Sequence, residues 1–208
     1  MSSLKCAILG EKVATQGAKH HVMVLTPSNM MPLGTQAPDF TLLDTVSGKN
    51  LSLQELKGEH ATVIMFICNH CPFVKHIQDE LVKLGQEYPA KGVNIIAISS
   101  NDVDNYPDDS PQNMKILADS LGYRFPYLYD ETQLVAKAYD ATCTPDFFIF
   151  DKDLKCVYRG QLDDSRPGNN IPVSGSDIRN VLASILSGNE VSIQQKPSVG
   201  CNIKWKQD

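Results

Sequence analysis

The sequence predicts an α/β protein with a mixed central β-sheet and helices on both of its faces. Two continuous apolar runs, at 61–67 and 93–98, have the composition of strands that are buried on both sides. Helical patterns separate these runs, and two apolar runs at 147–150 and 155–158 flank a turn, which predicts a late hairpin. Strands that alternate with helices before a hairpin predict a mixed sheet covered on both sides.

The elements of the first half follow from turn and capping signals. Residues 40–43 predict a short strand, and residues 46–50 predict the turn after it. Ser52 is placed to cap a short helix, because Glu55 stands at the capping-box position three residues later. The apolar run 61–67 then predicts the central strand of the sheet.

The later helices begin at residues that suit the first turn of a helix. Pro72 opens one helix, since its missing N–H would have no partner at that position. Ser110 is predicted to cap the next helix and Ser176 the last. A short strand at 127–129 and a short helix at 133–139 lie between them. Spacings of four, four and three predict the buried face of the first of these helices, formed by Phe73, Ile77, Leu81 and Leu84.

Composition restricts the class of protein. The chain has 208 residues, 42% of them hydrophobic, and a net charge of −5. This length suits one sizeable domain, and an acidic balance without a lysine or arginine block argues against nucleic acid or an anionic membrane as partner. No apolar run reaches the roughly 18 residues of a membrane-spanning helix. The first residues do not resemble a secretory signal, so we expect a cytoplasmic protein.

The chain divides into three predicted parts. Residues 1–33 have no sustained periodicity and are expected to form a loosely ordered N-terminal extension, with a candidate edge strand at 22–25. Residues 34–188 hold all the strong strand and helix signals and form the predicted domain. Residues 189–208 are expected to be a polar tail that carries Cys201.

One segment at the end of the central strand carries the chemistry. Cys68-Asn69-His70-Cys71 is followed by the helix that Pro72 opens. The N-terminus of a helix favours an anion, and a charged His70 could stabilise a neighbouring thiolate. Two cysteines three residues apart can also close a reversible disulfide. We therefore expect an acidic, exposed and attacking Cys68, and a more buried Cys71 that resolves the mixed disulfide.

Two other interpretations of the cysteine pair stay open. It could be half of a metal site, although no second Cys-x-x-Cys or His-x-x-x-His pattern completes four ligands. The two residues could also be ordinary core cysteines. In a protein without a secretory signal, redox chemistry is the favoured interpretation of the three, and we assign no metal.

A second element favours redox chemistry. Thr144-Pro145 comes directly before the strand of the late hairpin. A proline at this place could simply end a loop. If its peptide bond is cis, however, the preceding backbone could lie against the two sulfurs and pair with an extended substrate.

At these residues the chain resembles the thioredoxin-like superfamily. The resemblance is strongest to its redoxin branch, which includes alkyl hydroperoxide reductase, thiol-specific antioxidant and ResA/TlpA-like proteins. It covers about residues 34–188, with 101–124 similar to the insertion of redoxins. Three motifs carry it, namely Ala37-Pro38-Asp39-Phe40, Cys68-Asn69-His70-Cys71-Pro72 and Thr144-Pro145. The stretches 68–75, 143–148 and 158–167 more specifically resemble a Cys-Asn-His-Cys subfamily of thioredoxin-like proteins.

The resemblance implies a thioredoxin-like fold with a redoxin-type insertion, a Cys68–Cys71 redox pair and a cis peptide bond before Pro145. A histidine before the second cysteine is similar to oxidising members, which implies a less reducing pair than that of thioredoxin. One position departs from the peroxidase pattern. Peroxiredoxins place threonine or serine three residues before the peroxidatic cysteine, where this chain has Met65.

Three further cysteines could contribute to the site or to the core. Cys143 lies two residues before Pro145, and it could be either a buried core residue or a third redox thiol or metal ligand. Cys201 could be a mobile resolving thiol, but an inert tail cysteine is the favoured interpretation. Cys156 alternates with apolar residues in a predicted strand and is expected in the core.

The predicted function is that of a thiol–disulfide oxidoreductase. Its partners would be protein or small-molecule disulfides and a thiol reductant, with Thr144 and Pro145 binding substrate. No phosphate-binding glycine motif occurs, so we expect no organic cofactor. The alternatives are a thiol peroxidase and a copper- or zinc-binding module that uses Cys68, His70, Cys71 and Cys143. The sequence does not predict an oligomeric state.

Overall fold

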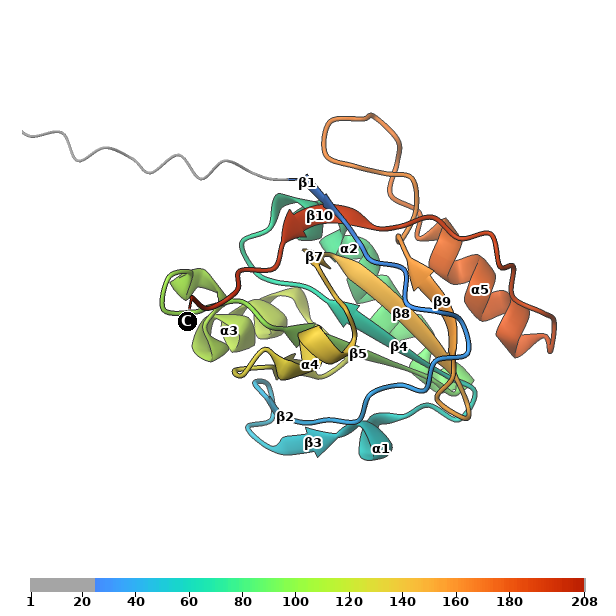
Figure 1. Cartoon of the computed structure of the whole chain (residues 1–208), viewed down its shortest axis with the longest axis horizontal. Coiled ribbons are helices and arrows are strands. Elements are labelled where there is room, and N and C mark those ends of the chain that lie inside the picture. Colours follow the sequence, from blue (N-terminus) through green and yellow to red (C-terminus); the bar gives the residue numbers. More distant parts are fainter. Residues whose placement is uncertain (1–24, 208) are drawn as a thin grey trace, which may run out of the picture.

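The computed structural model describes residues 25–207, and its architecture is a mixed sheet with helices on both faces (Figure 1). The large sheet has seven strands in the order β3-β2-β6-β5-β4-β8-β9. A second sheet of three strands has the order β1-β10-β7. The predicted fold class, a mixed sheet flanked by helices, is confirmed.

The elements have the following bounds. The strands are β1 (Leu25–Pro27), β2 (Thr41–Asp44), β3 (Asn50–Ser52), β4 (Ala61–Phe66), β5 (Val93–Ser99), β6 (Tyr127–Tyr129), β7 (Cys143–Thr144), β8 (Asp146–Asp151), β9 (Cys156–Gly160) and β10 (Val199–Asn202). The helices are α1 (Leu53–Leu56), α2 (Pro72–Glu87), α3 (Pro111–Leu121), α4 (Leu134–Ala138) and α5 (Ser176–Leu186), with 3-10 turns η1 (Pro89–Lys91) and η2 (Pro107–Asp109). No helix of the described part is long and apolar enough to cross a bilayer.

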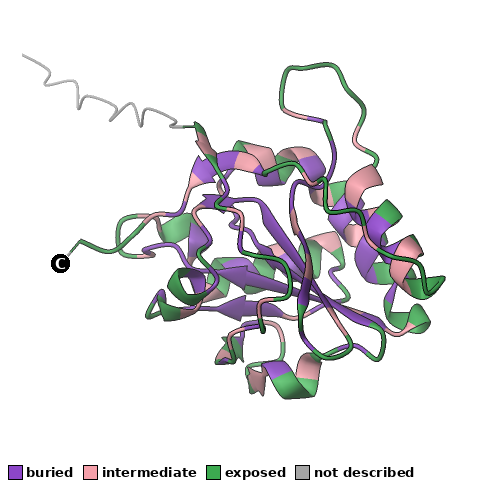
Figure 2. Ribbon diagram, turned by 45° about the vertical axis from the view of Figure 1, so that its right-hand side comes forward, coloured by how far each residue is buried: buried purple, intermediate pink, exposed green. Residues whose placement is uncertain are grey.

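The core is built on β4. All six of its residues are buried, and it pairs in parallel with β5 and antiparallel with β8. Val63 and Met65 contribute to one apolar cluster, whereas Ile64 and Phe66 contribute to the other. Because successive side chains of a strand point to opposite faces, β4 separates two layers of core. Figure 2 shows this buried centre surrounded by exposed helix faces.

Two details of the helices differ from prediction. The first buried residue of α2 is Val74, which joins Ile77 on the inner face, while Phe73 is half-buried. Helix α5 starts at Ser176, and its N-cap is Gly175 in the left-handed region at φ 65°. A capping serine was therefore the wrong interpretation, because the chain enters this helix through a conformation that favours glycine.

The end of the chain is the largest departure from the predicted organisation. Within the predicted polar tail, β10 pairs antiparallel with both β1 and β7. Cys201 and Ile203 of this segment are buried. In Figure 1 the strand lies between β1 and β7, beside the end of the central sheet. Of the predicted edge strand at 22–25, only its last residue belongs to β1, and 22–24 lie outside the described residues.

A buried carboxyl lies at the start of β8. Asp146 is fully buried opposite Phe66, and neither carboxyl oxygen has a hydrogen bond of good geometry among the described residues. Burial raises the pKa of Asp146 well above its ordinary value, and weak approaches of the Phe147 N–H and the Ser28 hydroxyl offset only part of this. The folded protein therefore holds this carboxyl protonated where an unfolded chain would ionise it.

We expect Asp146→Asn to stabilise the protein at pH 8 by about 1–3 kcal/mol. The unfolded chain ionises Asp146 above about pH 3.9, so the native stability linked to this proton is complete below that pH. This contribution to stability is lost as the pH rises through the pKa of Asp146 in the folded protein. The side-chain amide of Asp146→Asn does not titrate, so the variant does not lose stability in this way. Urea unfolding at pH 5 and pH 8 should show a difference that grows with pH. An equal difference at both pH values would contradict this account, and exposed Asp153→Asn is the matched control.

Candidate active site

The Cys-x-x-Cys segment lies at the junction that the sequence predicted. Strand β4 ends at Phe66, and α2 begins at Pro72 with Cys71 as its N-cap residue. The backbone of Cys71 is extended, at φ −65° and ψ 123°, which turns the chain from the strand into the helix. Both sulfurs are thereby held beside the N-terminus of a 16-residue helix, where unpaired backbone N–H groups favour negative charge.

Both cysteines of the motif are buried. Cys68 is 1% exposed and Cys71 is 0% exposed, so the expectation of an exposed Cys68 was wrong. The sequence argument considered only the strand–helix junction. In the folded chain, segments far along the sequence pack over this junction, namely β7, β10 and the end of η2.

The residue before Pro145 contacts both sulfurs. In its thiol form Cys71 donates to the backbone oxygen of Thr144, 3.2 Å from its sulfur, and the Thr144 hydroxyl lies 3.5 Å from the Cys68 sulfur. The Thr144–Pro145 peptide bond is cis. The cis bond implied by the resemblance and the expected contact of the preceding residue with the sulfurs are therefore both present, and substrate binding by these residues stays a prediction.

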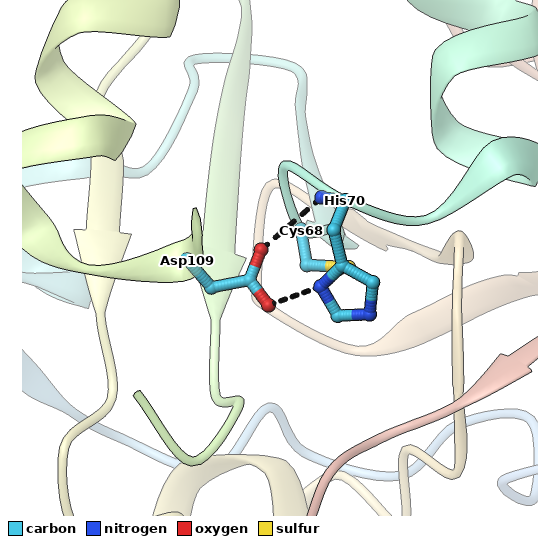
Figure 3. Close-up of side chains that lie close together, drawn as sticks. All are labelled: Cys68, His70 and Asp109. Atoms are coloured by element: carbon cyan, nitrogen blue, oxygen red, sulfur yellow. Dashed lines mark hydrogen bonds and ion pairs between the residues drawn. The ribbon is translucent and has the colours of Figure 1, made fainter. Parts of the chain in front are cut away.

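His70 is held by a carboxylate that the sequence analysis did not single out. Asp109 Oδ2 lies 2.6 Å from His70 Nδ1, and Oδ1 accepts the backbone N–H groups of Asn69 and His70 at 2.8 and 3.2 Å (Figure 3). The amide of Asn101 donates a fourth hydrogen bond to Asp109, at 2.8 Å. Asp109 therefore fixes the loop between the two cysteines from within the protein, where its side chain is 0% exposed.

This arrangement determines whether His70 can donate a hydrogen bond to Cys68. The Cys68 sulfur lies 4.0 Å from His70 Nδ1, the same nitrogen that faces Asp109. A proton on Nδ1 is therefore shared in the hydrogen bond with Asp109 and is not directed at Cys68. Stabilisation of a Cys68 thiolate by His70 stays a prediction. The His70 ring stacks on Tyr106 with centroids 5.4 Å apart and planes at 15°, and its side chain is 23% exposed.

The pKa values of the two thiols are shifted in directions opposite to those expected. Burial raises the pKa of Cys68, as do the hydrogen bond of its thiol to Cys71 and the negative charge of Asp109. Hydrogen bonds from the thiols of Cys201 and Cys68 lower the pKa of Cys71, and the backbone N–H of Val74 adds to this. Of the two thiols, Cys71 is therefore the more acidic. The prediction of an acidic Cys68 is wrong for this conformation.

The other predicted cysteines differ in their surroundings. Cys143 is buried, its thiol donates to the Pro145 carbonyl at 3.7 Å, and burial raises its pKa. Cys156 lies in the other core cluster, and burial raises its pKa to about 11. Cys201 is buried on β10 and contacts Cys71, so it does not lie on an exposed tail.

Sequence reasoning therefore missed two residues of the site, Asp109 and Cys201. Asp109 stands in an acidic, turn-rich stretch that is typical of a solvated loop, so no local signal marked it. For Cys201, the only signal of a role in the site was that it is a cysteine. Both reach the motif through contacts between segments that are at least 39 residues apart, which a single sequence does not reveal.

One group of side chains in the described part offers three metal-ligand types. Ligand atoms of Cys68, His70 and Asp109 lie within 4.8 Å of one another. Two ligands bound to zinc at about 2.0–2.1 Å stand roughly 3.3 Å apart in a tetrahedral site. The 2.6 Å between His70 Nδ1 and Asp109 Oδ2 is a hydrogen-bond distance instead. In this conformation His70 and Asp109 are thus hydrogen-bonded to each other and are not spaced as two zinc ligands.

Comparison with known proteins assigns the family. Residues 33–159 match the AhpC/TSA family. The chain belongs to the AhpC/TSA family. Within it, the chain resembles ResA-type redoxins: it is 29% identical to the thiol-disulfide oxidoreductase ResA of Halalkalibacterium halodurans over 119 residues, which are 57% of this chain and 62% of that protein. It thus spans less than two thirds of the length of this relative.

Solved structures show the same fold for this AhpC/TSA-family chain. An uncharacterized conserved protein from Geobacillus kaustophilus is 62% identical, with a TM-score of 0.89 over 90% of this chain and 99% of that chain. The thioredoxin domain of a thiol-disulfide oxidoreductase from Bacteroides vulgatus is 20% identical, with a TM-score of 0.55 over 65% of this chain and 92% of that chain. The predicted thioredoxin-like fold of the redoxin branch is confirmed.

Proposed function

We propose that this protein is a thiol–disulfide oxidoreductase whose redox pair is Cys68 and Cys71. The observation that carries the proposal is that both sulfurs lie at the N-terminus of α2 and contact one residue, Thr144, whose hydroxyl lies 3.5 Å from Cys68 Sγ and whose carbonyl oxygen lies 3.2 Å from Cys71 Sγ. Two sulfurs held against the same residue need little rearrangement to close a disulfide. Similarity to ResA-type thiol-disulfide oxidoreductases supports the class of reaction.

Cys68 is the attacking sulfur in this proposal. Cys71 is held at the N-cap of α2 by several donors, while Cys68 precedes the loop of His70, the partly exposed residue of the motif. The Cys68 sulfur attacks one sulfur of a substrate disulfide, and its proton passes to the Cys71 thiolate. The substrate S–S bond breaks, a Cys68–substrate disulfide forms, and the other substrate sulfur leaves with the electron pair.

Cys71 completes the reaction. Its proton passes to the departing thiolate, and the Cys71 thiolate then attacks the Cys68 sulfur. The mixed disulfide breaks, the substrate leaves with two electrons, and the Cys68–Cys71 disulfide closes. An external dithiol then reduces this disulfide and resets the pair. The partners are accordingly protein or small-molecule disulfides and a thiol reductant.

The proposal predicts that reduction of insulin disulfides by dithiothreitol is accelerated by the protein and depends on both cysteines. Cys68→Ser and Cys71→Ser should each lower the catalysed rate to the uncatalysed background, because neither can complete the two-step exchange. Cys156→Ser, a buried cysteine in the other core cluster, should retain the wild-type rate. If both motif variants kept the wild-type rate, the pair would not be the redox centre.

A further inference from the structure

The last strand of the chain lies where the reaction proposed above needs a substrate. Strand β10 pairs antiparallel with β7, with Cys201 opposite Thr144 and Asn202 opposite Cys143. An extended peptide can bind by adding a strand to an exposed edge, where main-chain hydrogen bonds hold it. At the β7 edge beside Pro145 the chain supplies this strand itself.

Gly200 shows how closely β10 approaches Thr144 and Pro145. A Cβ atom at Gly200 would lie 2.0 Å from the Thr144 carbonyl oxygen and 3.2 Å from Pro145 Cδ. The first of these atoms belongs to the backbone, so it could not yield as a flexible side chain would. Glycine at this position therefore permits the strand to reach the edge that borders the redox pair.

Strand pairing places Cys201 beside Cys71. Cys201 stands opposite Thr144, whose carbonyl oxygen lies 3.2 Å from the Cys71 sulfur, and the neighbouring Cys71 together with burial raises the pKa of the Cys201 thiol. Its side chain is only 5% exposed, and it belongs to the same apolar cluster as Cys68 and Cys71. The three cysteines thus belong to one buried cluster around Thr144.

We propose that Cys201 is a third redox thiol and that β10 presents it to Cys71 as an internal substrate strand. The inference rests on the proposed redox function of Cys68 and Cys71. Once the Cys68–Cys71 disulfide has formed, the Cys201 sulfur loses its proton and attacks the Cys71 sulfur. The Cys68–Cys71 bond breaks, a Cys71–Cys201 bond forms, and the electron pair and the proton go to Cys68.

This step needs no added oxidant, because one disulfide replaces another and the number of thiols stays the same. It returns Cys68 to the thiol form while the oxidising equivalent moves to the C-terminal segment. A reductant could then act on a disulfide carried by the four-residue strand β10 of the small sheet. The three cysteines would therefore separate the thiol that meets substrate from the disulfide that meets reductant.

The test uses the full chain with Cys68→Ser, equilibrated in a buffer of reduced and oxidised glutathione. We expect most molecules to contain a Cys71–Cys201 disulfide, identified by peptide mapping and mass spectrometry after the free thiols are alkylated. Cys68→Ser combined with Cys201→Ser should leave Cys71 without an internal partner. If Cys71 in the single variant stayed a free thiol, or paired with Cys143 or with glutathione, the inference would be overturned.

A second variant tests the role of the strand without removing a sulfur. Gly200→Ala in the Cys68→Ser background should lower the ratio of the Cys71–Cys201 disulfide to free thiols by roughly tenfold, since β10 can no longer hold Cys201 in place. An unchanged ratio would show that the strand does not position Cys201. Closure of Cys68–Cys71 in the Cys201→Ser protein reports on the proposed function separately, so the failure of one claim is distinct from the failure of the other.

Discussion

Asp109→Ala is expected to lower the free energy of unfolding by about 3–5 kcal/mol. The fully buried carboxylate accepts hydrogen bonds from the backbone N–H groups of Asn69 and His70, from His70 Nδ1 and from the Asn101 amide. Removal of the carboxylate leaves these donors without their acceptor inside the protein, and each buried donor left unpaired is costly. The loop between the two cysteines would lose its main anchor.

The measurement is urea unfolding of the wild type, Asp109→Ala and Asp108→Ala. Asp108 precedes Asp109 but has an exposed side chain, so its replacement should change the free energy of unfolding by less than about 0.5 kcal/mol. Asp109→Asn keeps the shape but loses the charge, and it should fall between the two. Equal stability of the two alanine variants would contradict the role assigned to Asp109.

The second large effect concerns the sulfur that carries the negative charge. We expect the thiolate absorbance near 240 nm at neutral pH to persist in Cys68→Ser and to disappear in Cys71→Ser. In Cys68→Ser the new hydroxyl and the Cys201 thiol still donate to Cys71, which holds the pKa of Cys71 low. In Cys71→Ser the remaining Cys68 is buried near Asp109, and both effects raise its pKa.

The pH dependence of the thiolate absorbance shows in which direction the pKa of Cys71 is shifted. The absorbance of the wild type and of Cys68→Ser should vanish only on acidification, because a lowered thiol pKa keeps the thiolate present at neutral pH. Burial raises the pKa of Cys143 and Cys156, so these residues should not contribute. A Cys6→Ser background removes the cysteine outside the described residues. Absorbance retained in Cys71→Ser and lost in Cys68→Ser would reverse the assignment.

Local signals made the strand–helix junction predictable. The apolar run before Cys68 and the proline after Cys71 determine a buried strand and the start of a helix, and both lie where expected. The acidity of Cys68 was predicted from the same local features, the helix N-terminus and His70. In the folded chain, burial and the carboxylate of Asp109 outweigh them. Desolvation depends on what covers a group, and the covering segments are distant in sequence.

The C-terminal strand illustrates a different limit. β10 has four residues, Val-Gly-Cys-Asn, without the alternation of a half-buried strand. Its partner β7 has only two residues, and the pairing joins segments more than 50 residues apart. Such short strands gain their stability from the edge on which they pack. No pattern within 189–208 could therefore predict the pairing or the contact of Cys201 with Cys71.

The most direct test of the central claim is a redox titration of the Cys201→Ser protein in glutathione buffers, with disulfides mapped by mass spectrometry. This variant removes the competing third thiol and leaves Cys68 and Cys71 in place. The account predicts that both thiols are lost together, as one Cys68–Cys71 disulfide, and return together when the buffer is made reducing. If both cysteines could still be alkylated after unfolding at every buffer ratio, the two residues would not form a redox pair.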